Sequence, residues 1–388
     1  MKFRFIIIVI AIWTGTCITS FAQPNFSVTG KIGQQAQGMI YLVYKNHGKP
    51  MLDSSEVRNG VFSIKGELGD PVFATLTLNP HWTEDHRGFT HTDFQSFFLD
   101  ATPYSVIGNG TLKTSVITGG KVQEDYIAHG KPLEPLNKKM DALVAEMTRY
   151  RTAGNDSAQN LIIKKMNDLH AKVDSSDSAY VTHHYDSYVA YTIWKNKHRG
   201  IVEPEVDKEF IRFSPAVRQT EEGKKMAAKL EVAKRLSVGK TPLDFTLPQP
   251  EGKMLSLSDL KGKNVLLYFW YKNFAGFDDF AFNISKMQRQ LGKRNFVILA
   301  VYYDIMGGET KETWTSTLKE YSFNWLNVSD LGGVRDGTVP ISPAAKYFGL
   351  DNTTLPQAFL IGPDGTITAR HLRLQDRDLY LKVEKMLK

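Results

Sequence analysis

Cysteine is almost absent from this sequence, whose 388 residues include only Cys17. Cys17 lies within the first 22 residues, a segment that we expect to be removed from the mature chain. Without it the chain can form no disulfide bond and offers no thiolate as a nucleophile or metal ligand. Thiol chemistry by the mature chain's own side chains is therefore excluded.

Other features are missing as well. No run of 18 apolar residues occurs, so we expect no transmembrane helix in the mature chain. The formal net charge is +7 and no block of six or more Lys/Arg residues occurs, which argues against nucleic-acid binding. No G-x-S-x-G, H-E-x-x-H or P-loop motif is present, and we predict no cofactor and no metal.

The N-terminal segment, residues 1–22, has the pattern of a signal peptide. Lys2 and Arg4 precede an apolar stretch of nine residues, Phe5 to Trp13, which is too short to span a bilayer. Ser20 and Ala22 supply small residues at the −3 and −1 positions, so we expect cleavage after Ala22. Export to the periplasm follows from this prediction.

A lipoprotein signal is the alternative, with Cys17 as the lipidated residue. Thr14 stands where such signals usually have leucine, and Thr16 where they usually have Gly or Ala. We therefore favour export without a lipid anchor.

Residues 24–122 have the pattern of an all-β domain. Several short segments alternate or cluster β-branched and aromatic residues, and Gly or Asn-Gly turns separate them. These segments read FSVTGKI, GMIYLVYK, GVFSIKGEL, PVFATLTL and FQSFFLD. Strands at this spacing predict a small sandwich or open barrel.

Residues 123–236 change to a helical pattern. One apolar stripe recurs at intervals of three and four, comprising Leu136, Met140, Leu143 and Met147. Similar segments follow, separated by polar turns such as TAGNDS. We expect a module of three to five helices with this stripe in its core.

Residues 237–388 have a mixed α/β pattern. NVLLYFW and FVILAVYY are continuous apolar runs, as in strands of a buried sheet. AFLIG and TITARHL flank a Pro363-Asp364-Gly365 turn and predict a hairpin. The expected order is β-α-β-α-β-β-α, with parallel strands first and the hairpin last.

The motifs of this third part resemble those of secreted thioredoxin-like and peroxiredoxin-related domains, over residues 237–388. The residues that match are Val238, Gly239, Pro242, Phe245, Gly262, Lys263, Phe269 and Trp270. Later, TTLPQAFLIGPDGTI resembles the family's cis-proline strand, with Pro356 as the candidate cis residue. The resemblance implies a C-terminal α/β thioredoxin-like fold.

The first part also carries a resemblance. Asp53-Ser54-x-x-Val57, followed by Asn59-Gly60-x-Phe62-x-x-Lys65-Gly66, is similar to an uncharacterised β-domain that precedes thioredoxin-like domains in secreted Gram-negative proteins. The resemblance thus implies a three-part protein with an all-β domain, a helical module and a thioredoxin-like domain.

The resemblance breaks at the active-site turn. Counted from Trp270, the two cysteines of the family fall on Phe274 and Phe277, and the dipeptide between them on Ala275-Gly276. The family's preceding tryptophan falls on Asn273. Redox chemistry there needs a thiolate of low pKa and a second thiol, and phenylalanine provides neither. We therefore predict no catalytic residue.

Two interpretations of this turn remain open. In the first, Trp270, Phe274, Phe277, Leu355 and Pro356 form an exposed apolar groove that binds an extended peptide, which pairs with the backbone of Leu355. In the second, both phenylalanine rings point inward and the site is a relic. Acidic Asp278 and Asp279 are explained by the helix dipole, not by acid/base catalysis.

Two histidine groups are weak candidates for a metal site. His81, His86 and His91, with Glu84 and Asp85 nearby, match no standard ligand spacing, so we interpret them as a polar loop. His183 and His184 are adjacent in a helical pattern and point to different faces.

We therefore predict an exported, non-catalytic protein of the cell envelope that binds a peptide or another protein, or serves as a scaffold. One alternative, by family resemblance, is a thiol-disulfide oxidoreductase or antioxidant protein that acts only with a partner's thiols. A weaker alternative is a glycan- or metal-associated protein that works through the β-domain.

Overall fold

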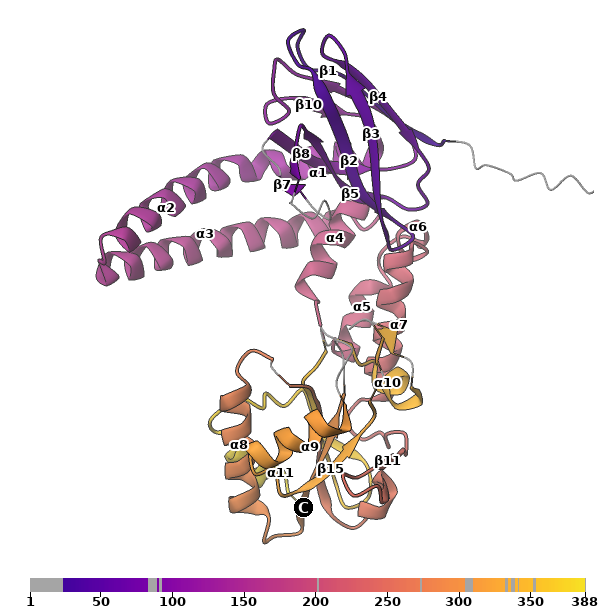
Figure 1. Cartoon of the computed structure of the whole chain (residues 1–388), viewed down its shortest axis with the longest axis vertical. Coiled ribbons are helices and arrows are strands. Elements are labelled where there is room, and N and C mark those ends of the chain that lie inside the picture. Colours follow the sequence, from indigo (N-terminus) through magenta and orange to yellow (C-terminus); the bar gives the residue numbers. More distant parts are fainter. Residues whose placement is uncertain are drawn as a thin grey trace, which may run out of the picture. The chain divides into compact units, whose positions relative to one another are not determined.

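The computed structural model describes residues 24–82, 89–90, 93–200, 202–272, 274–303, 310–331, 334–335, 339–340, 342–351 and 354–387. The chain forms two compact units, one ending at Asn137 and the other beginning at Lys138. The predicted series of a β-rich part, a helical part and an α/β part is confirmed (Figure 1). The predicted signal segment and Cys17 lie outside the described residues. Within the described residues, no helix combines the length and apolar character needed to cross a membrane.

The first unit is a sandwich of two four-stranded sheets, whose orders are β10-β9-β1-β4 and β3-β2-β5-β8. The strands of the first sheet are β1 (Phe26–Lys31), β4 (Val61–Gly66), β9 (Pro103–Ile107) and β10 (Val116–Thr118). Those of the second are β2 (Gly38–Asn46), β3 (Lys49–Val57), β5 (Val72–Leu78) and β8 (Asp93–Leu99). Alternate residues such as Ile40 and Leu42 enter one shared core, as the period of two in the sequence requires.

Helix α1 (Lys121–Gly130) covers the edge strand β8 of this sandwich. The Gln123 side chain accepts a hydrogen bond from the Phe98 N–H at 3.0 Å, and the Tyr126 ring packs 5.3 Å from the Phe98 ring. A backbone donor that an edge strand would otherwise leave open is thereby satisfied. The short strands β6 (His81–Trp82) and β7 (Phe89–Thr90) pair with each other.

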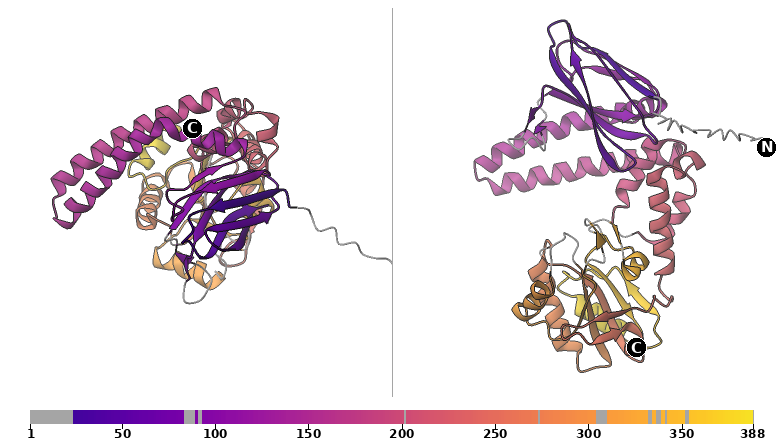
Figure 2. Two further views of the ribbon diagram at one scale, coloured as in Figure 1. Left: turned by 90° about the horizontal axis from the view of Figure 1, so that it is seen from above. Right: turned by 45° about the vertical axis from the view of Figure 1, so that its right-hand side comes forward.

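Two long helices, α2 (Glu134–Thr152) and α3 (Asp156–His183), are joined by a short turn (Figure 2). The Asn155 side chain accepts a hydrogen bond from the Ala158 N–H at 3.0 Å and caps α3. The helix predicted over the Met/Leu stripe is confirmed as α2. The prediction that the stripe lies in a core is wrong, because α2 has no buried residue and the side chains of the stripe are only half-buried.

The other helices of this module are shorter. They are α4 (Tyr188–Lys197), α5 (Asp207–Phe210), α6 (Pro215–Arg218) and α7 (Glu221–Arg235), with the 3-10 turns η1 (Lys131–Leu133) and η2 (Pro204–Val206). The described residues thus hold more helices than the three to five predicted. Their core is aromatic, with Tyr191, Trp194 and Phe213 buried together.

The C-terminal domain contains a five-stranded sheet in the order β15-β14-β13-β18-β19. Its strands are β13 (Asn264–Trp270), β14 (Phe296–Tyr302), β15 (Leu326–Ser329), β18 (Gln357–Ile361) and β19 (Ile367–Arg370). The first three are parallel, whereas β18 and β19 form the predicted antiparallel hairpin. Every residue of β13 is buried, because helices cover both faces of the sheet.

The two faces of β13 belong to two cores. Leu266, Tyr268 and Trp270 pack against α8 (Phe277–Leu291), α9 (Lys311–Glu320) and α11 (Leu379–Met386). Leu267 and Phe269 pack against α10 (Pro343–Phe348). The remaining short elements are β11 (Thr246–Pro248), β12 (Met254–Ser256), η3 (Leu257–Leu260), β16 (Val334–Arg335) and β17 (Val339–Pro340).

Two arginines join α7 to the C-terminal domain. Arg235, the last residue of α7, donates hydrogen bonds to the carbonyls of Tyr347 and Lys346 near the end of α10, at 2.6–2.9 Å. Arg370, on β19, donates to the carbonyls of Ala233 at 2.8 Å and Leu236 at 3.3 Å, near the end of α7. Each guanidinium thus satisfies carbonyls that a helix end leaves without an intrahelical partner.

Candidate functional site

The turn between β13 and α8 lies where the resemblance places an active site. Trp270 ends β13, and Phe277 begins α8. Gly276 precedes the helix with φ of 82°, a left-handed conformation that glycine adopts without strain. Asn273 lies outside the described residues. The sequence therefore does build the strand-turn-helix that presents the two cysteines in the family.

Both phenylalanines of this turn are buried. The exposed fraction is 7 % for Phe274 and 8 % for Phe277, and their ring centroids are 5.3 Å apart. Phe274 also lies 5.2 Å from the Phe280 ring, and Phe277 lies 4.9 Å from the Tyr321 ring. The interpretation of an exposed aromatic patch is wrong for these two side chains. Burying two large apolar rings among aromatic neighbours is more favourable than leaving them in water.

Trp270 belongs to the same cluster and is fully buried. Its ring lies 5.8 Å from that of Phe277 and 4.8 Å from that of Tyr302. Its Nε1–H has no hydrogen-bond acceptor among the described residues. The side chain that we placed in a binding groove therefore packs inside the domain.

The Leu355–Pro356 bond is cis, as the sequence predicts. Gln357, which follows it, pairs with Phe269, so the proline lies at the same end of the sheet as the turn. The Leu355 side chain is buried and its N–H donates to the Asp351 carbonyl at 3.2 Å. The backbone donor expected to pair with an extended peptide is thus already bonded within the chain, while Pro356 stays half-buried.

Polar contacts tie this turn to the end of α9. Lys272 Nζ lies 3.6 Å from a carboxylate oxygen of Glu320, and the Tyr321 hydroxyl donates to Asp278 at 3.4 Å. Asp278 and Asp279 occupy the first turn of α8, where negative charge is favoured by the dipole. The groups around the turn therefore have structural partners, and its central residues are two rings that cannot ionise.

The histidine candidates do not converge in the described part of the chain. His184 stacks on the Tyr180 ring at 4.3 Å, whereas His183 Nδ1 lies 2.7 Å from the Ala179 carbonyl oxygen. The loop residues Glu84, Asp85, His86 and His91 lie outside the described residues. Within the described residues, no three His, Cys, Asp or Glu side chains are grouped so that they could hold a metal ion.

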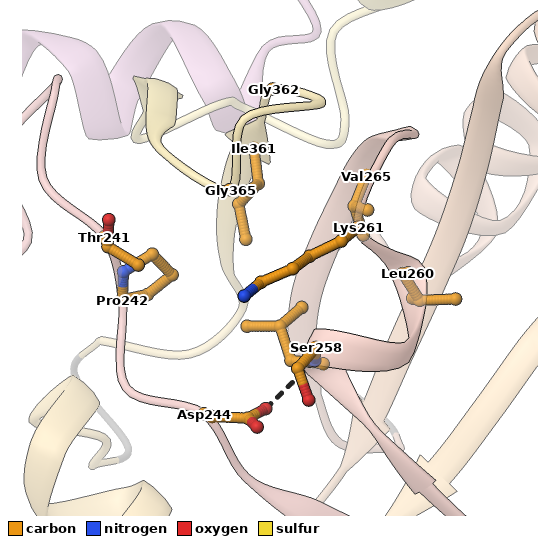
Figure 3. A pocket seen from close by; sticks show the side chains of 11 residues that line it. Thr241, Pro242, Asp244, Ser258, Leu260, Lys261, Val265, Ile361, Gly362 and Gly365 are labelled. Carbon is orange, nitrogen blue, oxygen red and sulfur yellow. Dashed lines mark hydrogen bonds between the residues drawn. The ribbon is translucent and has the colours of Figure 1, made fainter.

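A pocket of about 140 Å³ lies at the opposite end of the sheet, which the sequence did not reveal (Figure 3). Val265 near the start of β13 and Ile361 at the end of β18 form its apolar wall. The Lys261 side chain extends into it from one side, and the Asp244 carboxylate accepts the Ser258 N–H at 3.0 Å. Its lining comes from three distant segments, which is why no local motif pointed to it.

Comparison with known proteins gives two family matches. Residues 238–370 match the model of the AhpC/TSA family, and residues 26–126 match that of a domain of unknown function, DUF4369. The chain is 33 % identical to a Coxiella burnetii protein named "Putative peroxiredoxin bcp", over 34 % of this chain and 87 % of that one. It is 25 % identical to the thiol-disulfide oxidoreductase ResA of Bacillus cereus, over 37 % of this chain and 75 % of that one.

Solved structures are matched as well. The thioredoxin domain of a thiol-disulfide oxidoreductase from Bacteroides vulgatus is matched at 25 % identity with a TM-score of 0.33, over 39 % of this chain and 99 % of that one. A thiol-disulfide oxidoreductase from Bacteroides fragilis is matched at 26 % identity with a TM-score of 0.32, over 38 % of this chain and 100 % of that one.

Proposed function

This chain belongs to the AhpC/TSA family, and we propose that within this family it is a redox-inactive protein of the cell envelope that binds a peptide or another protein, or serves as a scaffold. The observation that carries the proposal is the pair Phe274 and Phe277, which occupies the two cysteine positions of the resemblance and is buried. Thiol-disulfide exchange needs a thiolate that attacks a disulfide and a second thiol that resolves the product. Neither ring can take part in such a step.

The binding half of the proposal uses the exposed part of the same turn. Ala275 and Gly276 are exposed between the two buried rings, and Pro356 is half-buried at the same end of the sheet. Because the Leu355 N–H is bonded to Asp351, a partner would contact the turn through its exposed backbone and through Pro356, instead of adding a strand beside Leu355. Location in the periplasm rests on the signal-like pattern of residues 1–22.

An insulin-reduction assay tests the redox half, using the full chain exported and processed by a Gram-negative host. We expect turnover equal to the blank for the wild type. The Phe274→Cys/Phe277→Cys variant should gain activity if the turn still positions a thiol pair, whereas a Phe282→Cys/Lys319→Cys variant, with two exposed and separate thiols, should not. Turnover by the wild type would instead support an oxidoreductase that uses other thiols.

Site-specific photo-crosslinking in the native envelope tests the binding half. The crosslinking residue replaces exposed Ala275, and a matched control replaces exposed Lys319 on α9. A discrete product that forms at Ala275 and not at Lys319 supports recognition at the turn. The same set of products at both positions would contradict it.

A further inference from the structure

A second pocket, of about 350 Å³, lies in the helical module, away from the thioredoxin-like turn. The end of α3, helix α4 and the segment around α5 surround it. The side chains that matter for its chemistry are Tyr185, Trp194, Lys197, His198, Glu209 and Arg212. This volume is in the range of pockets that take small organic ligands.

Two cations line this pocket without a carboxylate partner among the described residues. Lys197 Nζ donates to the Ser178 hydroxyl at 2.9 Å and to the Asp174 carbonyl at 3.2 Å, both of which are neutral acceptors. The Arg212 guanidinium lies over the Tyr185 ring, 4.2 Å from its centroid. Neutral contacts therefore hold both groups, and neither forms an ion pair with a carboxylate of the described residues.

The one carboxylate of the lining, Glu209, is already engaged. It accepts the indole N–H of Trp194 at 2.7 Å and lies 3.9 Å from His198 Nε2. Burial lowers the pKa of His198, so this ring is neutral near neutral pH. The pocket then has an excess of one positive charge, which suits a monoanion better than a dianion such as phosphate.

Part of the lining of the pocket is apolar. Val181 and Trp194 are both buried and both line it, and Trp194 is held by the surrounding aromatic core, with the Phe213 ring at 5.3 Å. An apolar surface beside a few charged groups is typical of sites for amphipathic small ligands.

We propose that this pocket binds an organic monocarboxylate that carries a compact apolar group. The carboxylate lies at Lys197 and Arg212, and the apolar group lies against Val181 and Trp194. Free organic acids and the C-terminal carboxylate of a peptide share this chemistry. The proposal is independent of any thiol chemistry and of the turn at Phe274.

Calorimetric titration of the full chain with phenylacetate tests the proposal, with 2-phenylethanol as the uncharged probe of similar shape. We expect phenylacetate to bind at millimolar concentrations and 2-phenylethanol not to bind. Arg212→Gln and Lys197→Gln should each weaken binding about tenfold, since a hydrogen bond to a charged group contributes about this much. Lys208→Gln removes an exposed charge on α5 outside the pocket and should leave binding unchanged.

A second titration distinguishes the two sources of the carboxylate. It compares N-acetyl-Gly-Phe, which ends in a free carboxylate, with its C-terminal amide. Binding of phenylacetate alone assigns the pocket to small acids, and tighter binding of the free-carboxylate peptide than of phenylacetate assigns it to peptide termini. No binding of either acid, or binding that survives in both Arg212→Gln and Lys197→Gln, would overturn the proposal.

Discussion

The two ends of the five-stranded sheet differ in how densely side chains pack there. At the carboxyl end of β13, Trp270, Phe274, Phe277 and Phe280 fill the interior with rings about 5–6 Å apart. At the amino end a pocket of about 140 Å³ remains open beside Val265. The filled end is the one where the resemblance places the reactive cysteines. The two positions that hold cysteines in the resemblance are therefore also positions that carry this packing.

The two ends should also differ in their contribution to the free energy of folding. A fully buried phenylalanine side chain contributes about 1.5–3 kcal/mol to folding relative to an exposed one. Two such rings at the head of α8 fix the helix to the sheet and to Tyr321. The filled end should therefore be a source of stability, whereas exposed side chains at the open end, such as Lys261, should contribute little to folding.

Replacement of Phe280 tests the filled end and should have the largest effect. Phe280→Ala leaves a cavity beneath both Phe274 and Phe277, and we expect the free energy of unfolding to fall by about 3–5 kcal/mol. Urea unfolding followed by near-UV circular dichroism measures it. Phe282→Ala is the matched control on the same helix, because Phe282 is 60 % exposed while Phe280 is fully buried. Equal losses for the two variants would refute the prediction.

Acid should weaken the C-terminal domain through His371. His371 precedes Leu372 and Leu374, which pack on the same core as Phe274 and Phe277. Burial, and then the charge of Arg370, lower the pKa of His371 to about 4. Glu203 lies 3.3 Å from His371 Nδ1, but it is about half exposed and its attraction is screened by water.

The sign of the effect follows from linkage. Because the pKa of His371 is lower in the folded state than the ordinary value near 6.5, the unfolded state binds more protons between these values. The contribution of neutral His371 to the free energy of unfolding is therefore present above about pH 6.5 and is lost as the pH falls towards 4. We expect unfolding of the wild type to become easier by about 1–3 kcal/mol over this range. His371→Asn should remove that part of the pH dependence, and an unchanged slope in the variant would contradict the assignment.

Replacement of Lys261 tests the open end and should have the smallest effect. Lys261 is exposed and extends into the pocket (Figure 3), so Lys261→Ala should change the free energy of unfolding by no more than about 0.5 kcal/mol. The same urea titration measures it. A loss close to that of Phe280→Ala would mean that the two ends do not differ in the way described.

Much of the C-terminal domain could be predicted from sequence, because its signals are local. The continuous apolar run of β13, the apolar face of α8 and the Pro-Asp-Gly turn each have a short-range pattern, and all three are confirmed. The cis bond before Pro356 was also predicted, from the family resemblance. Strand β15 and helix α10 were missed, because four to six residues are too few to show a period.

The direction of the rings at the turn could not be predicted. A phenylalanine before or at the first turn of a helix fits an inward or an outward position, and only the neighbours Phe280 and Tyr321 decide between them. The core position predicted for the stripe on α2 is wrong for a related reason. The period of the stripe identifies one face of the helix, but it does not show whether other residues cover that face. The pocket near Arg212 was missed because residues between 178 and 212 meet only in three dimensions.

The reciprocal arginines carry a consequence for how such chains recombine. Arg235 belongs to the helical part and bonds to α10, whereas Arg370 belongs to the thioredoxin-like part and bonds to the end of α7. An exchange of domains at the sequence boundary near residue 237 would separate each guanidinium from its carbonyls. An exchange that keeps these hydrogen bonds must therefore carry α7 along with the sheet, so the segment to be exchanged is longer than the segment that bears the family's motifs.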